Sequence, residues 1–133
     1  MRVGIWFLKL AAFYFLVGVA MGLTMEIIGD HRLSGAHAHI NLIGWASMAL
    51  FGIIYVLFPK AGETKLAQLH FWLYNISFPL FMLGLSFILL GNESLLILLM
   101  IFPNFLVLAV VFFVLNIFLQ VKVEHVNSFV NKN

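Results

Sequence analysis

Long apolar segments, separated by short polar ones, dominate the pattern along the chain. They cover about residues 5–25, 38–58, 69–90 and 95–119. A helix of about 20 apolar residues crosses the ~30 Å hydrocarbon core of a bilayer. No stretch shows the apolar/polar alternation over about ten residues that is typical of a membrane β-barrel. The pattern therefore predicts an all-α integral membrane protein with four spanning helices.

Short polar turns connect these segments. Pro59 ends the second segment and a polar turn follows it at residues 60–65, while Gly-Asn-Glu-Ser at 91–94 separates the third segment from the fourth. Connections this short place successive helices side by side and antiparallel. We therefore expect residues 1–133 to form one domain, an up-down four-helix bundle.

The basic residues predict the orientation of this bundle. One side of the membrane would carry Arg2, Lys60, Lys65, Lys122 and Lys132, and the other side only Arg32. Because positive charge gathers on the cytoplasmic side, both termini are predicted to be cytoplasmic. The connection between the first two helices then faces outward.

Composition supports the membrane interpretation and removes other classes of function. The chain is 64% hydrophobic and 9% charged, and it contains no cysteine. Disulfides and thiolate metal sites are thus excluded. The net charge of +2 is too small to indicate a nucleic-acid partner, so the lipid bilayer is the expected surrounding.

One face of the second segment is more polar and has smaller residues than the rest of that helix. Steps of three and four residues connect its members, which are His37, Asn41, Gly44, Met48, Gly52 and Tyr55. Small residues allow helix backbones to approach closely in lipid. We expect this face to point into the bundle.

The outward connection contains the candidate chemistry. The stretch GDHRLSGAHAHINLIGW, residues 29–45, places His31, His37 and His39 at a membrane boundary, where ionisable groups often mark functional sites. On an ideal helix His37 and His39 point about 200° apart, so they share a metal ion only if the chain near Gly35 is unwound. In that case the three histidines and Asp30 would hold zinc or copper. The alternative, of equal weight, is a set of interfacial histidines hydrogen-bonded to water and carbonyls.

Two segments resemble a known family. HINLIGW at 39–45, followed by GIIYVLFP at 52–59, looks like the second helix of the catalytic subunit of heme-copper oxidases, and it is closest to the nitric oxide reductase branch. FWLYNISFPL at 71–80 is similar to the next helix of that subunit. The pattern at residues 30–45 also resembles small four-span bacterial proteins described as oxidase subunit I-like.

The resemblance implies a heme site near the outer surface. His39 would be an axial ligand of a b-type heme and Arg32 would pair with a propionate. A helical wheel instead turns His37 into the bundle and His39 away from it, which makes His37 the second candidate ligand. The other axial position would be filled by Met25, by Met82 or by His39 of a second copy, or it would stay open.

The same resemblance limits the expected activity. The oxidases bring their remaining heme ligand and their copper ligands from later helices that this chain lacks. We therefore expect no oxygen or nitric oxide reduction, and no other enzymatic activity is predicted. The implied function is that of a small cytochrome of the bacterial inner membrane, for electron transfer, gas sensing or heme handling. It would act as a homo-oligomer or beside a respiratory-chain partner. The alternative is a heme-free membrane protein whose histidines bind zinc or copper, or an accessory scaffold subunit.

Overall fold

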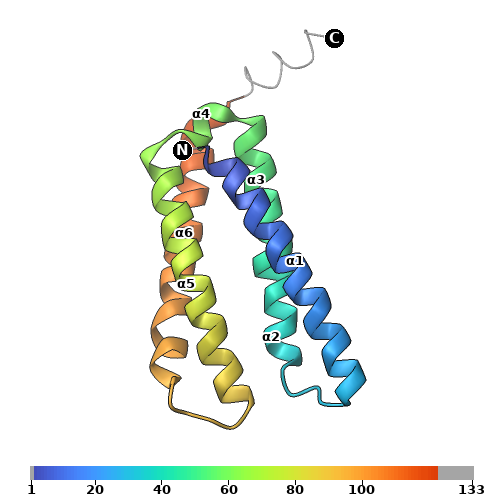
Figure 1. Ribbon diagram of the computed structural model, residues 1–133. Helices are drawn as coiled ribbons and strands as arrows, with labels where there is room; N and C mark the ends of the chain where they lie inside the picture. The colour runs from blue at the N-terminus through green and yellow to red at the C-terminus, as the bar shows by residue number, and fades with distance from the viewer. Residues whose placement is uncertain (1, 123–133) are drawn as a thin grey trace.

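Four long helical segments run up and down in chain order (Figure 1). The computed structural model describes residues 2–122. Within them α1 covers Val3–Ile28, and the second segment is built from α2 (Ser34–His39), the π-helix η1 (Ile40–Ser47) and α3 (Met48–Leu57). After the short α4 (Pro59–Gly62) come α5 (Lys65–Leu89) and α6 (Leu96–Gln120). The all-α prediction is confirmed, and each expected segment falls within a few residues of an observed one.

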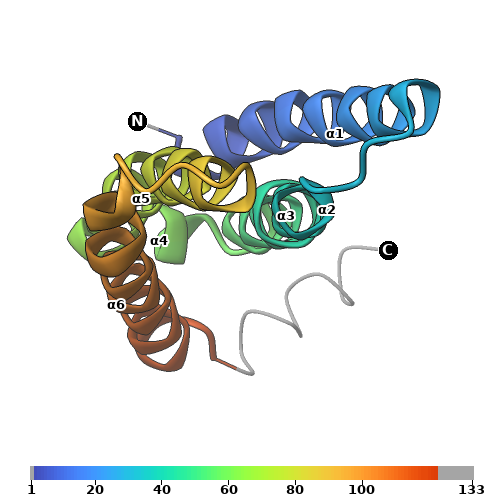
Figure 2. The same ribbon diagram turned by 90° about the horizontal axis from the view of Figure 1, so that it is seen from below.

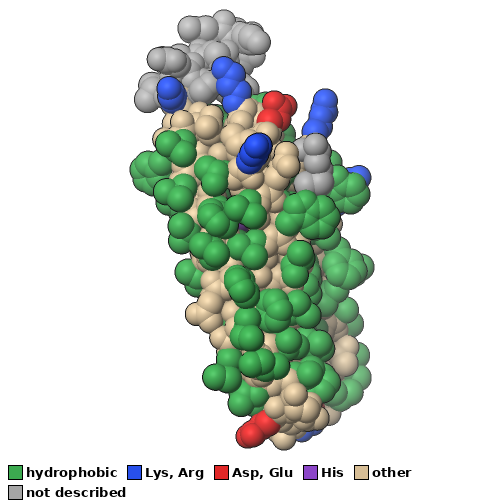
Figure 3. All heavy atoms as spheres, turned by 90° about the vertical axis from the view of Figure 1, so that its left-hand side faces the viewer, with side chains coloured by type: hydrophobic (Ala, Val, Ile, Leu, Met, Phe, Trp, Pro, Cys, Tyr) green, Lys and Arg blue, Asp and Glu red, His purple; other side chains and the backbone are tan. Residues whose placement is uncertain are grey.

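All four segments are long and apolar enough to cross a membrane. Figure 3 shows the side of the molecule covered by hydrophobic side chains, with Lys, Arg, Asp and Glu confined to its two ends. Such a surface is costly in water and favourable in lipid. The chain thus has the length and composition of a multi-pass membrane protein.

The helices form two hairpins. α1 packs along η1 and α3, whereas α5 packs along α6. In the first hairpin the backbones approach closely at two glycines. A Cβ atom added to Gly4 would lie only 2.9 Å from the carbonyl oxygen of Gly52. Seen from below, α6 lies on the far side of α5 from α1 (Figure 2).

Aromatic side chains join the two hairpins near α4. The ring of Phe7 on α1 lies 5.6 Å from that of Phe51 on α3 and 5.0 Å from that of Phe71 on α5, measured between centroids. All three residues are buried. Edge-to-face packing of this kind adds about 0.5–1.5 kcal/mol per pair beyond area burial.

A polar network anchors α6 at the same end. The amide of Asn116, which is fully buried, donates to the carbonyl oxygen of Ala61 at 2.8 Å, and its Oδ1 accepts from Thr64 Oγ1 at 2.8 Å. Thr64 also caps α5, because its Oγ1 accepts from the backbone N–H of Ala67. One hydroxyl therefore organises the turn into α5 and the end of α6.

The π-helix is the local feature that periodicity did not predict. Its wider turns offer backbone carbonyls to side chains, and Ser47 Oγ donates to Leu42 O at 2.9 Å, while Tyr74 OH of α5 donates to Ile43 O at 3.1 Å. The second bond connects the two hairpins. The expected bundle-facing character of this segment is confirmed, since Gly44, Met48, Gly52 and Tyr55 are buried.

Candidate functional site

The connection between α1 and α2 is held by an ion pair. Gly29 ends α1 with a φ of 67°, and Arg32 then donates from Nε and Nη2 to the Asp30 carboxylate at 3.0 and 2.6 Å. Hydrogen bonds from the Arg32 side chain and backbone hold the pKa of Asp30 at about 2, and the same pair raises the pKa of Arg32. The guanidinium that was expected to meet a heme propionate is thus engaged with Asp30.

His31 is directed to the surface. Its Nε2 lies 3.5 Å from Oε2 of Glu26, and both side chains are exposed. The side chain therefore pairs with the end of α1 and not with the histidines that follow.

His37 faces α1. A Cβ atom on Gly22 would lie 2.9 Å from Cε1 of His37, so the ring packs directly on the glycine side of α1. Asn41 Nδ2 donates to the His37 carbonyl oxygen at 2.9 Å and lies 3.3 Å from His37 Nδ1. Met25, which is buried, lies three residues after Gly22 and therefore on the same face of α1.

His39 faces α5. Its Nδ1 lies 2.7 Å from the carbonyl oxygen of Gly35, and its half-buried ring meets Phe81 edge-on, with centroids 5.5 Å apart. The expectation that His39 turns away from the bundle is therefore wrong, because α5 lies on this side. His37 and His39 do diverge, as the helical wheel indicates.

The histidines are not gathered into one ligand set. Residues 34–39 are helical from Ser34, so the unwound start that a shared metal ion requires is not present. Within residues 2–122 no group of three His, Asp or Glu side chains lies close enough to hold a metal ion. His31, His37, His39 and Asp30 instead point to the surface, to α1, to α5 and to Arg32.

Sequence reasoning missed the burial of a further histidine. His70 on α5 is fully buried, its Nδ1 lies 3.0 Å from the hydroxyl of Tyr55, and its Nε2 has no hydrogen-bond partner. The rings of Phe7, Phe51 and Phe113 lie 4.7–5.3 Å from it, between centroids. The only signal in the sequence was an ionisable residue inside an apolar span, because its partners come from three other helices.

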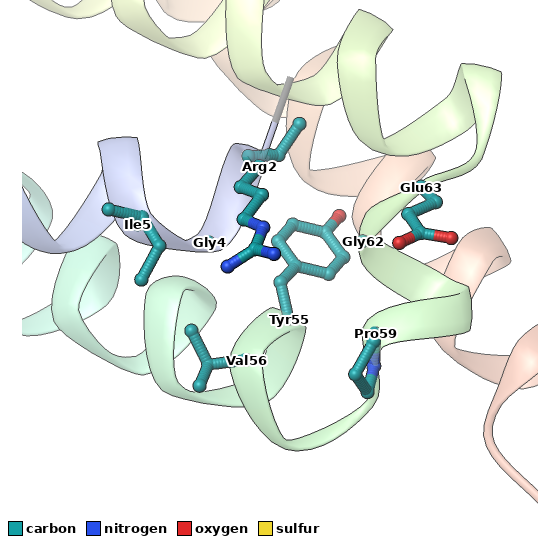
Figure 4. Close-up of a pocket in the computed structure, with 9 residues that line it drawn as sticks. Arg2, Gly4, Ile5, Tyr55, Val56, Pro59, Gly62 and Glu63 are labelled. Carbon is teal, nitrogen blue, oxygen red and sulfur yellow. The ribbon is translucent and has the colours of Figure 1, made fainter.

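A cavity of about 300 Å³ opens at the α4 end. Figure 4 shows Arg2, just before α1, and Tyr55 of α3 reaching into the same space, with Glu63 beyond them. This end is opposite to the one that carries His39, because α4 and the α1–α2 connection lie at opposite ends of the bundle (Figure 1). The cavity therefore does not belong to the histidine site.

Comparisons with models of protein families, with curated proteins and with solved structures gave no match. The resemblance to heme-copper oxidases therefore rests on the sequence motifs alone.

Proposed function

We propose that this protein is a multi-pass membrane protein that binds a b-type heme through His39. The observation that carries the proposal is the hydrogen bond between His39 Nδ1 and the Gly35 carbonyl. A carbonyl only accepts, so Nδ1 must hold the proton and the lone pair is left on Nε2. An imidazole oriented in this way by a backbone carbonyl is the usual form of a histidine that ligates a metal or heme iron.

The hydrogen bonds of His37 favour His39 as the ligand. The donation from Asn41 Nδ2 to the His37 carbonyl fixes which end of the amide is the NH2 group. That NH2 group also meets His37 Nδ1, which therefore accepts, so the proton of the neutral ring lies on Nε2. His37 has no ring nitrogen free to bind iron without losing this bond.

The surroundings of His39 fit a heme in part. Phe81 packs on the ring of His39, and Leu50 and Ile53, further along the same spanning segment, are exposed apolar side chains. Among the described residues of α1, α2 and the turn between them, no other histidine faces α5. Met25 lies on the α1 side, and Met82 of α5 is buried in the hydrophobic core. We infer that a bound heme would have His39 as its only protein ligand from this chain, and that Arg32 would reach a propionate only by leaving Asp30. Such a heme would supply one-electron transfer or a site for a diatomic gas.

The charges at the two ends support the proposed orientation in a bacterial inner membrane. The α4 end carries Arg2, Lys60, Lys65 and Lys122 with Glu63, whereas the other described end carries Arg32 with Glu26, Asp30 and Glu93. Lys132 lies outside the described residues. The positive-inside rule then favours cytoplasmic termini and an outward-facing His39.

Absorption spectroscopy tests the proposal directly. The protein is expressed with ample heme, purified in mild detergent and measured oxidised, dithionite-reduced and reduced with carbon monoxide, together with a pyridine hemochrome assay. We expect about one heme per chain and loss of the heme in His39→Ala. The reduced Soret band should shift with carbon monoxide, because His39 would be the only ligand that this chain supplies. His37→Ala is the matched control and should keep it.

Two results would overturn the heme proposal. One is a colourless protein under these conditions, and the other is a heme that His39→Ala retains. Elemental analysis of the same sample distinguishes the remaining possibilities. Zinc or copper would indicate a membrane protein whose histidines bind metal, and the absence of both metals would indicate a scaffold subunit.

A further inference from the structure

The outer face of α6 is left uncovered by the bundle. In the most apolar 18-residue stretch of α6, 11% is buried inside the bundle. The corresponding share is 28% in each of the other three spanning segments. The buried residues of α6, Leu106, Ala109 and Asn116, all lie on one side of the helix. Figure 2 shows α6 at the edge of the molecule, beyond α5.

The opposite side of α6 follows a heptad pattern. Its residues are separated by alternating steps of four and three, and together they form the α6 stripe: Ile97, Ile101, Asn104, Leu108, Val111, Leu115 and Phe118. All seven are exposed, and in the six apolar members the exposed fraction runs from 40% in Ile101 and Leu108 to 84% in Phe118. Spacing of this kind is what paired helices bury as their knobs-into-holes seam.

Asn104 is the one polar member of the α6 stripe. It lies about 12 Å along the axis from Leu96, at 1.5 Å per residue, which is deep within the hydrocarbon of a membrane-inserted helix. Among the described residues its Nδ2 donates only to backbone carbonyls of its own helix, at 2.7 Å to Met100 O and 3.4 Å to Ile101 O. By contrast, the other asparagine of α6, Asn116, is buried and bonded to Thr64 and Ala61. No described residue donates to its Oδ1, and an exposed carboxamide with an unpaired oxygen at this depth calls for a partner outside the chain.

We propose that the α6 stripe is the contact surface for a second copy of this chain, with the two Asn104 side chains paired across a two-fold axis along the membrane normal. A carboxamide is both donor and acceptor, so its best complement at the same depth is an identical carboxamide. Two copies inserted in the same orientation bring the same residue to the same depth, and a heptad seam with one central asparagine matches itself. The inference is independent of heme binding, because His39 faces α5, whereas the α6 stripe lies on the side of α6 opposite to its buried residues.

Cysteine cross-linking in vesicles tests the geometry. The chain has no cysteine of its own, so single substitutions report only their own position. Val111 and Val110 are adjacent, chemically identical and similarly exposed, at 44% and 37%, but only Val111 lies on the stripe. We expect Val111→Cys and Leu115→Cys to form disulfide-linked dimers on mild oxidation, and Val110→Cys to stay monomeric. Equal cross-linking at Val110 and Val111 would overturn the proposal.

Energy transfer between labelled full-length copies in vesicles tests the role of the asparagine. One such bond in a membrane is worth enough that Asn104→Leu should weaken association about tenfold. Val111→Phe should also weaken it, while Val110→Phe should not. Circular dichroism of each variant confirms that it is folded, which is expected because the altered side chains are exposed. Two results would overturn the proposal. One is a wild-type chain that stays monomeric at all protein-to-lipid ratios, which is expected if the natural partner is a different protein. The other is unchanged association of Asn104→Leu.

Discussion

Replacing Tyr55 with phenylalanine should destabilise the protein although it removes a single oxygen atom. The hydroxyl of Tyr55 is the hydrogen-bond partner of His70 Nδ1, at 3.0 Å, and His70 Nε2 already has none. In Tyr55→Phe the fully buried imidazole of His70 would have no hydrogen-bond partner for either nitrogen. The ring of residue 55 would keep its contacts with Phe7 and Phe113. Leaving a buried polar group unpaired costs about 1–3 kcal/mol, so we expect the free energy of unfolding to fall by about 2 kcal/mol.

The companion variant should behave differently. His70→Leu removes both ring nitrogens, so in the double variant Tyr55→Phe/His70→Leu no polar atom of the pair is left buried. Replacing both partners by apolar groups is often nearly neutral. We expect the double variant to unfold within about 1 kcal/mol of the wild type, which gives a favourable coupling between the two residues in a double-mutant cycle.

Unfolding of the purified protein in mixed micelles with increasing sodium dodecyl sulfate, followed by circular dichroism, measures these differences. Tyr14→Phe is the matched control, because Tyr14 is half-buried and donates no hydrogen bond in the described part of the chain. Its unfolding free energy should change by less than about 0.5 kcal/mol. If Tyr55→Phe were as stable as the control, His70 would not depend on Tyr55 and the reasoning would be refuted. If His39 binds heme as proposed, the heme content should be unchanged in all of these variants, because His39 lies at the other end of the bundle.

Two further outcomes follow from the turns. Thr64→Val should lower the free energy of unfolding by about 2–3 kcal/mol in the same assay. It removes the cap of α5 and leaves the buried Asn116 Oδ1 without its donor, whereas Thr64→Ser, which keeps the hydroxyl, should match the wild type. Because the pKa of Asp30 is lowered to about 2, its ion pair with Arg32 should contribute to stability above the ordinary aspartate pKa of about 3.9 and be lost as the pH falls through about 2. Carbon-detected NMR should find the Asp30 carboxyl titrating near that value, and Arg32→Gln should return it towards 3.9; a wild-type midpoint already near 3.9 would contradict the pairing.

The spanning segments could be predicted because the information for them is local. A run of about 20 apolar residues can satisfy its backbone in lipid only as a helix, whatever surrounds it. The small-residue face through Gly44, Met48, Gly52 and Tyr55 was also predictable, since close approach in lipid depends on side-chain size alone. Both follow from residues within one helix.

The details of the site could not be predicted because they depend on contacts between helices. Periodicity describes a regular helix and carries no sign of the π-helix at Ile40–Ser47, whose Ile43 carbonyl is taken by Tyr74 from another helix. The direction of His39 depended in the same way on the position of Phe81. The burial of His70 likewise depends on rings from α1, α3 and α6.

The distribution of contacts between the two hairpins supports the proposal that His39, and not His70, would ligate a heme. The cross-hairpin hydrogen bonds of the described residues, Tyr74 to Ile43 and Tyr55 with His70, lie from the middle of the bundle towards α4, where the aromatic cluster also packs. Beyond Ile43, towards the α1–α2 connection, α2 and α5 meet through apolar contacts such as that of His39 with Phe81. Admitting a flat apolar cofactor beside His39 would break no hydrogen bond between the hairpins and would replace one apolar contact by another. Reaching His70 would require opening the buried aromatic cluster and its bond to Tyr55, which suits a residue that fastens the hairpins together.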